Sequence, residues 1–152
     1  MDKFGYQMDE APLLNQKFYS RPSVFTPQNL LREARRQKKI TELVIPEICI
    51  LDPDGDIEEY VIQKHRAQPN IAWACYHTRL SEFKHGNINV GIIGRAVGAS
   101  FAVLLAEQLF ASGCKLLLSM TSSGQLVQPM EPPYFILIEK AVRDEGTSYH
   151  YV

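Results

Sequence analysis

Residues 88–120, INVGIIGRAVGASFAVLLAEQLFASGCKLLLSM, constrain the fold of this chain more than any other segment. A β-branched apolar strand runs into a turn of small residues, and a helix follows over about 98–112. Gly113 stands where a C-terminal cap glycine belongs, and residues 115–120 form a second apolar strand. This strand–helix–strand unit predicts a right-handed crossover between parallel strands that are buried on both faces.

The helix within this unit has an apolar stripe at three- and four-residue spacing, which predicts the face that packs on the sheet. The stripe consists of Phe101, Leu104, Leu105, Gln108 and Leu109. Thr26 and Pro27 begin another helix that runs to residue 39, because threonine caps free N–H groups and proline fits a first turn. Further strands are predicted at 47–51, 71–78 and 134–142, and a short helix at 57–65.

Five strands with interleaved helices predict an α/β fold: a mixed, mostly parallel sheet with flanking helices, in one domain over residues 25–152. With 152 residues, 45% of them hydrophobic, the chain can bury a substantial core. Only about a dozen residues follow the last strand, so the fold is expected to be truncated, with one face uncovered. Residues 1–24 are expected to be an irregular arm, either a free tail or a segment that docks on a partner.

Charge and hydropathy exclude several functional classes. The formal net charge is −1, which gives no general attraction to nucleic acid or to an anionic membrane. The basic end of the first helix is best interpreted as a solvated face. No apolar run is long enough to span a bilayer, and the N-terminus does not resemble a signal peptide. We therefore expect a cytoplasmic protein whose three cysteines are reduced.

Two short patterns resemble metal sites, and neither fits one. Asp52, Asp54 and Asp56 alternate around a glycine, but the glycine comes one position early for a calcium loop and no closing glutamate follows. Cys75 and His77 would share one face of a strand, but no second pair of ligands appears at zinc-site spacing. The sequence therefore predicts no metal site.

The turn between the central strand and helix, GRAVGAS, is a candidate anion site. A helix N-terminus presents free N–H groups, and Arg95 adds a charge with bidentate geometry. The spacing of Gly91, Gly94 and Gly98 is not that of a dinucleotide-binding turn or a P-loop. Two interpretations stay open: an anion site, or small residues that let strand and helix approach closely.

Two further segments carry polar groups. Ser122, Ser123 and Gly124 follow a buried strand, at the sheet edge where α/β proteins bind ligands. A serine nucleophile is disfavoured because the G-x-S-x-G elbow is absent. Residues 143–150, which include Arg143, Asp144 and His150, are either a functional cluster or a solvated terminus.

Taken in order, DPDGDI, WACYHT, GIIGRAVGASFAVLLAEQLFASGCKLLLSMTSSGQL and AVRDEGTSYHY resemble the nucleoside phosphorylase family. The resemblance runs from about residue 25 to the end. It implies an α/β fold around a mixed, partly barrel-like sheet. It also implies ribosyl transfer between a nucleobase and phosphate, in homo-oligomers, with phosphate as co-substrate and no other cofactor.

The resemblance assigns the phosphate and ribose side of the site to the Gly94–Ser100 turn and the Thr121–Gly124 loop. Arg143, Asp144 and His150 would line or brace that site. Two positions depart from the family, because Ser119 and Ile57 stand where arginines are expected to hold phosphate. Arg95 or Arg143 would have to substitute; otherwise the activity is hydrolytic or lost.

Family members are much longer, so the resemblance makes this chain the N-terminal half of such an enzyme. The acid that protonates the leaving base would lie in the other half, and no catalytic residue is assigned here. The leading hypothesis is a nucleoside phosphorylase-like protein that is inactive alone or active with its other half. The alternatives are a phosphate-independent nucleosidase, a nucleotide-binding domain and a non-catalytic interaction module. The choice of purine or pyrimidine stays open.

Overall fold

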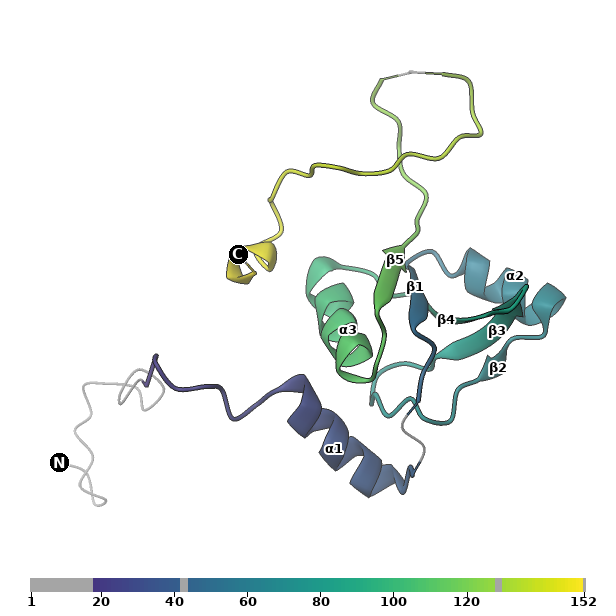
Figure 1. Ribbon diagram of the computed structural model, residues 1–152. Coiled ribbons are helices and arrows are strands. Elements are labelled where there is room, and N and C mark those ends of the chain that lie inside the picture. The colour runs from purple at the N-terminus through teal and green to yellow at the C-terminus, as the bar shows by residue number, and fades with distance from the viewer. Residues whose placement is uncertain (1–17, 42–43, 128–129, 152) are drawn as a thin grey trace, which may run out of the picture.

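The computed structural model describes residues 18–41, 44–127 and 130–151 and contains one five-stranded sheet flanked by helices (Figure 1). The helices are α1 (Pro27–Lys38), α2 (Asp56–His65), α3 (Ala99–Ala111) and the short 3-10 helix η2 (Ser148–His150). The strands are β1 (Ile48–Asp52), β2 (Gln68–Pro69), β3 (Ser81–His85), β4 (Ile88–Gly94) and β5 (Leu116–Ser119).

The strand order is β2-β3-β4-β1-β5. The central strand β1 pairs in parallel with β4 on one side and β5 on the other, whereas β2, β3 and β4 pair in antiparallel fashion. The predicted α/β class and mixed sheet are therefore confirmed, but the sheet is not mostly parallel, because two of its four pairings are antiparallel. The predicted strand–helix–strand unit is also confirmed, since α3 connects β4 to β5, which both run parallel to β1. The prediction that both strands are buried on both faces is wrong for β5, an edge strand whose Leu116 and Leu118 are exposed.

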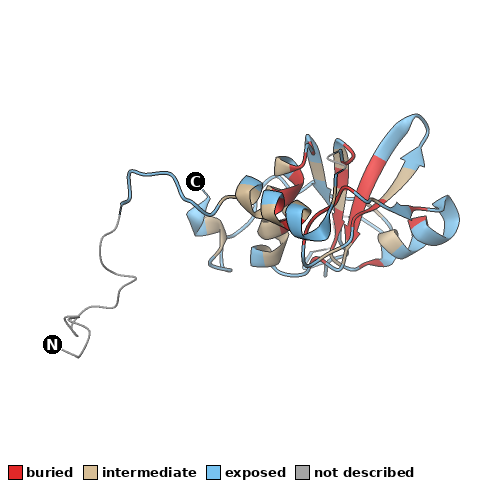
Figure 2. Ribbon diagram, turned by 90° about the horizontal axis from the view of Figure 1, so that it is seen from below, coloured by how far each residue is buried: buried red, intermediate tan, exposed pale blue. Residues whose placement is uncertain are grey.

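Both faces of the sheet carry helices (Figure 1). The largest core cluster lies between the strands and α3, and includes Leu51, Ile93, Leu105 and Leu109. The helix α1 packs against α3 through a smaller cluster around Leu31 and Ala34. On the opposite face, Val61 of α2 packs with Ile92. Figure 2 shows the buried residues gathered between the sheet and these helices.

Local signals place the helix ends. The Thr26 hydroxyl accepts a hydrogen bond from Asn29 N at 3.2 Å, and Pro27 is the first residue of α1, as predicted. Gly113 follows α3 with φ +108°, a conformation that side chains with a Cβ rarely adopt, so the predicted C-terminal stop is also confirmed.

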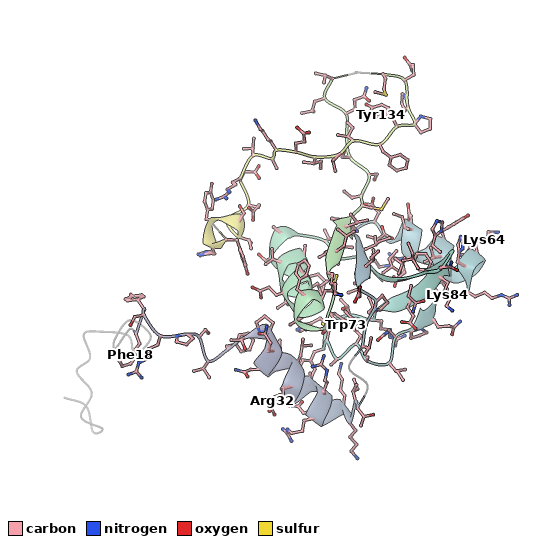
Figure 3. All side chains as sticks on the ribbon, in the orientation of Figure 1. Phe18, Arg32, Lys64, Trp73, Lys84 and Tyr134 are labelled. Carbon is pink, nitrogen blue, oxygen red and sulfur yellow. The ribbon has the colours of Figure 1, made fainter. Side chains whose placement is uncertain are left out.

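Two predicted strands are wrong. Residues 71–78 form turns and irregular backbone, although Ala72, Trp73, Ala74 and Cys75 are buried. Residues 134–142 form neither helix nor strand and pair with no strand that the structure describes, and Figure 3 shows Tyr134 on a segment that arches away from the sheet. The two strands that complete the five-stranded sheet are β2 and β3, which the sequence did not predict. The segment β3, SEFKH, has one large apolar residue and offers little apolar periodicity to detect.

The predicted arm, residues 1–24, lies mostly outside the described residues, which begin at Phe18. Residues 18–25 are exposed and irregular, and they include Phe18, Tyr19 and Phe25 with more than half of each side chain accessible. Among the described helices, none combines the length and the apolar character that crossing a membrane requires.

Candidate functional site

Three loops meet at one edge of the sheet, the edge formed by the carboxyl ends of its parallel strands. The Asp52–Gly55 turn follows β1, the Gly94–Gly98 turn follows β4, and the Thr121–Gly124 loop follows β5. Because β1 lies between β4 and β5, its turn separates the two loops that the sequence assigned to a ligand. This edge is where open α/β sheets bind ligands.

Asp52, at the end of β1, organises the edge. Its side chain is 1% exposed, and its two carboxylate oxygens accept hydrogen bonds from Gly55 N at 3.0 Å and Glu58 N at 2.8 Å. These bonds satisfy free N–H groups at the start of α2, whose own N-cap, Gly55, has no side chain to do so. The Asp52 carbonyl oxygen accepts a bond from Arg95 N at 2.7 Å, which fixes the β4 turn to the β1 turn.

The loop after β5 binds a carboxylate of the same chain. Ser122 N donates to Asp54 Oδ2 at 2.7 Å, and the Thr121 hydroxyl donates to the same oxygen at 3.1 Å. The hydrogen bond from the Ser122 backbone lowers the pKa of Asp54 below its usual value. A backbone N–H and a hydroxyl that converge on one oxyanion form the type of contact that also holds phosphate oxygens.

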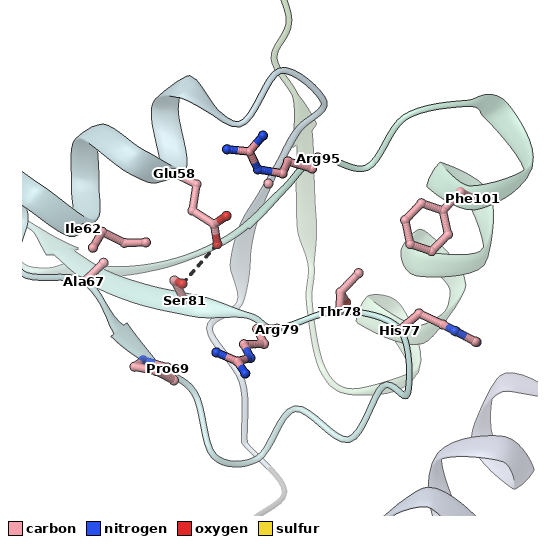
Figure 4. A pocket seen from close by; sticks show the side chains of 11 residues that line it. Glu58, Ile62, Ala67, Pro69, His77, Thr78, Arg79, Ser81, Arg95 and Phe101 are labelled. Carbon is pink, nitrogen blue, oxygen red and sulfur yellow. Dashed lines mark hydrogen bonds between the residues drawn. The ribbon is translucent and has the colours of Figure 1, made fainter.

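A cavity of about 460 Å³ lies on the other side of the β1 turn, between α2, β3 and the start of α3 (Figure 4). Its polar lining includes Glu58, His77, Arg79, Ser81 and Arg95. Figure 4 shows Glu58 reaching from α2 toward Ser81, whose hydroxyl donates to Glu58 Oε1 at 3.1 Å. Arg79 forms no ion pair with any residue that the structure describes. The cavity thus offers one carboxylate and two guanidinium groups.

Gly94 brings the strand and Glu58 into contact. A Cβ at this position would lie 2.3 Å from Glu58 Oε2 and 3.1 Å from its carboxyl carbon, so any side chain would displace the carboxylate. The small residue thus serves close approach here, one of the two interpretations of the GRAVGAS turn. Arg95 has φ +62°; its side chain extends over Gly55 and pairs with Glu59.

The site residues predicted from the sequence lie in three places: the turn after β4, the loop after β5, and the C-terminal segment beside α3. Gly94 and Arg95 line the cavity, whereas Gly98 is the N-cap of α3 and lies outside the lining. Ser122 contacts Asp54; Ser123 and Gly124 are exposed and do not line the cavity. The two predicted loops therefore share an edge but not one cavity.

Arg143, Asp144 and His150 belong to a C-terminal segment that lies against α3, away from the cavity. Glu145 accepts hydrogen bonds from the backbone N–H groups of Thr147 at 2.8 Å and Ser148 at 3.2 Å. The Thr147 hydroxyl meets the Ser100 hydroxyl at 2.6 Å, and the Tyr151 hydroxyl donates to Glu107 at 2.8 Å. These contacts place the segment along α3, from Ser100 in its first turn to Glu107 in its third.

Sequence analysis did not identify Glu58, Arg79 or Ser81 as site residues. Glu58 is one of several acids in the first turn of α2. Ser81 begins a strand that was not predicted, and Arg79 lies two residues before it. The Gly86–Asn87 turn between two extended segments was the one available signal, because such a two-residue connection marks a hairpin and so places a strand over 81–85. In the part of the chain that the structure describes, no three potential ligands cluster to hold a metal ion.

The bond between Asp54 and Ser122 predicts a pH dependence. Because the pKa of Asp54 is lowered in the folded state, its stabilising contact is complete above the ordinary aspartate value near 3.9 and is lost as pH falls through the folded pKa. In an NMR titration, Ser122→Pro removes the N–H donor and should raise the pKa of Asp54. Ser123→Ala is the control, and an Asp54 pKa equally raised in that variant would contradict the assignment.

No protein-family model, curated protein or solved structure matches this chain.

Proposed function

We propose that this chain binds a nucleoside and phosphate at the carboxyl edge of its parallel strands, as the phosphate-side part of a nucleoside phosphorylase-like protein. Ribosyl transfer between a nucleobase and phosphate is the proposed reaction. The observation that carries the proposal is the capture of the Asp54 carboxylate by Ser122 N and the Thr121 hydroxyl. The loop that the sequence assigned to phosphate thus already holds an oxyanion.

The chemistry of glycosidic bond cleavage fits the groups at this edge. The sugar gains positive oxocarbenium character as the bond breaks, and a phosphate held beside it stabilises that charge and then forms the new bond. Phosphate would replace Asp54 on Ser122 and Thr121. Arg95 follows β4 on the same sheet edge, beyond the β1 turn, and its guanidinium pairs with Glu59. It would have to leave Glu59 to serve in place of the arginines that the family has at Ser119 and Ile57. No residue here is assigned to protonate the leaving base, and the proposal includes no metal or organic cofactor.

Two alternatives remain as competing proposals. A phosphate-independent nucleosidase would use water in place of phosphate, and the absence of arginine at residues 57 and 119 favours it. A non-catalytic interaction module is favoured by β5, an edge strand with Leu116 and Leu118 exposed. All three proposals apply to a cytoplasmic, oligomeric protein.

The test is release of free base from a panel of purine and pyrimidine nucleosides, with and without phosphate, measured by liquid chromatography. Phosphate-dependent release with formation of ribose 1-phosphate is expected. Release without phosphate would replace the proposal with the nucleosidase. No release from any nucleoside would contradict ribosyl transfer by this chain and favour the interaction module.

The Asp54→Asn variant tests phosphate binding separately from catalysis. The variant removes a negative charge that competes for Ser122 N, so phosphate should bind several-fold more tightly in isothermal titration calorimetry. Asp56→Asn is the matched control, because Asp56 lies two residues away and is exposed. Equal phosphate affinity in wild type, Asp54→Asn and Asp56→Asn would remove the loop from the proposed phosphate site.

A further inference from the structure

The sheet ends in an open apolar edge at β5. Among the described residues this strand pairs only with β1, so its outer N–H and C=O groups face away from the sheet. Leu117 packs into the α3 core, which places Leu116 and Leu118 on the opposite face by strand alternation. Leu116 is 47% exposed and Leu118 is 43% exposed. In register beside them are Ile48 and Ile50 of β1, each partly exposed, so four aliphatic residues form one incompletely covered strip.

The segment Phe135–Ile138 has the complementary properties. Its four consecutive side chains, Phe135, Ile136, Leu137 and Ile138, are 94%, 68%, 87% and 74% exposed. The backbone of residues 135–142 forms neither helix nor strand, and no backbone hydrogen bond joins it to another described residue. A run that is apolar at every position suits a strand covered on both faces, and exposed in water it is unfavourable.

The segment lies apart from the β5 strand of its own chain. The polypeptide leaves β5 at the carboxyl edge of the sheet and later returns to α3. The Thr147 hydroxyl meets Ser100 in the first turn of that helix, and the Tyr151 hydroxyl donates to Glu107 in its third turn. These contacts attach the C-terminal residues to α3, and Figures 1 and 3 show Phe135–Ile138 on a segment that runs clear of the sheet. A strand presented in this way is available to another molecule.

We propose that residues 134–142 of one copy add as a strand to the β5 edge of a second copy, and that the exchange is reciprocal. The opposite edge strand, β2, has only two residues, so β5 is the edge long enough to accept a strand. Each copy thus carries one free segment and one such edge, and two copies satisfy both and close with two-fold symmetry. The added strand covers Leu116 and Leu118 and supplies the backbone partners that β5 lacks. This inference concerns assembly and does not rest on the proposed ribosyl transfer.

The first test is the mass of the protein in solution, by light scattering coupled to size exclusion, across a dilution series. The wild-type chain is expected to be a dimer that dissociates on dilution. Leu137→Asp should be a monomer with an unchanged circular dichroism spectrum. Ile71→Asp is the matched control, because Ile71 is 74% exposed beside the opposite edge of the sheet, and it should stay dimeric.

The second test locates the contact. Leu118→Cys chains carrying a size tag are mixed with untagged Ile136→Cys chains and treated with a short bis-maleimide, since the three native cysteines are buried. A crosslinked tagged–untagged pair is the expected product. A monomeric wild type at all concentrations would overturn the proposal. So would efficient crosslinking only within a single Leu118→Cys/Ile136→Cys chain, because the segment would then occupy its own edge.

Discussion

Truncation of Leu105 to alanine is expected to lower the free energy of unfolding by about 2–5 kcal/mol. Leu105 is 0% exposed, lies in the middle of α3, and belongs to the core cluster that joins this helix to the sheet. Alanine keeps the helix but leaves a cavity that the surrounding strands cannot fill. Domains of this size are stable by roughly 5–15 kcal/mol, so the loss should be a large part of the total.

The measurement is urea denaturation followed by circular dichroism, with Phe110→Ala as the control on the same helix. Phe110 is 52% exposed, so its truncation should lower the free energy of unfolding by only about 1 kcal/mol. Similar losses in both variants would mean that α3 does not pack on the sheet through the Leu105 face. The crossover that places the candidate site would then be wrong as well.

The crossover could be predicted because its signals are local. Residues 88–120 contain β-branched strands, a helical stripe and a stop glycine, and each of these acts through its near neighbours in sequence. The stripe is confirmed at Leu105, Gln108 and Leu109, which are buried, whereas Phe101 and Leu104 are half-buried. The cap at Thr26 was predictable for the same reason, since an N-cap depends on a side chain and an N–H group three residues away.

The two wrong strands fail for a different reason. An apolar run predicts burial, and residues 72–75 are indeed buried, but burial does not require a strand. There the indole N–H of Trp73 donates to the Thr78 hydroxyl at 3.0 Å, within a looped segment. Residues 134–142 show the converse, because their apolar pattern suits a strand, yet a strand forms only where another strand pairs with it. The sequence of a segment does not show whether another strand is available to pair with it.

The location of the candidate site could be predicted from the sequence, but most of the residues that form it could not. Parallel strands imply a ligand-binding edge, so the loops after β4 and β5 could be named from the sequence. The turn that lies between them could not, because the strand order that inserts β1 depends on long-range pairing. For this reason the sequence did not predict that Asp54 contacts the Thr121–Gly124 loop. It also did not predict that Glu58 and Arg79 line the cavity.

Replacement of Asp52 by alanine is expected to lower the free energy of unfolding by about 2–3 kcal/mol, because it leaves Gly55 N and Glu58 N without their acceptor. Asp52 is 1% exposed, so water cannot substitute fully. The exposed neighbour Asp56 is the control, and Asp56→Ala should cost about 0.5 kcal/mol or less. Chemical denaturation measures both, and equal losses would contradict the assigned role of Asp52.

The same substitution should also disturb the site, and this separates a capping role from general destabilisation. Without the Asp52 carboxylate the first turn of α2 frays, so Glu58 loses its position against Gly94 and Ser81. Asp52→Asn keeps one acceptor oxygen and should retain about half of the lost stability. Amide exchange at Glu58 should therefore accelerate strongly in Asp52→Ala, less in Asp52→Asn, and not in Leu105→Ala below its unfolding transition. Faster exchange at Glu58 in all three variants would show that α2 follows global unfolding rather than its Asp52 cap.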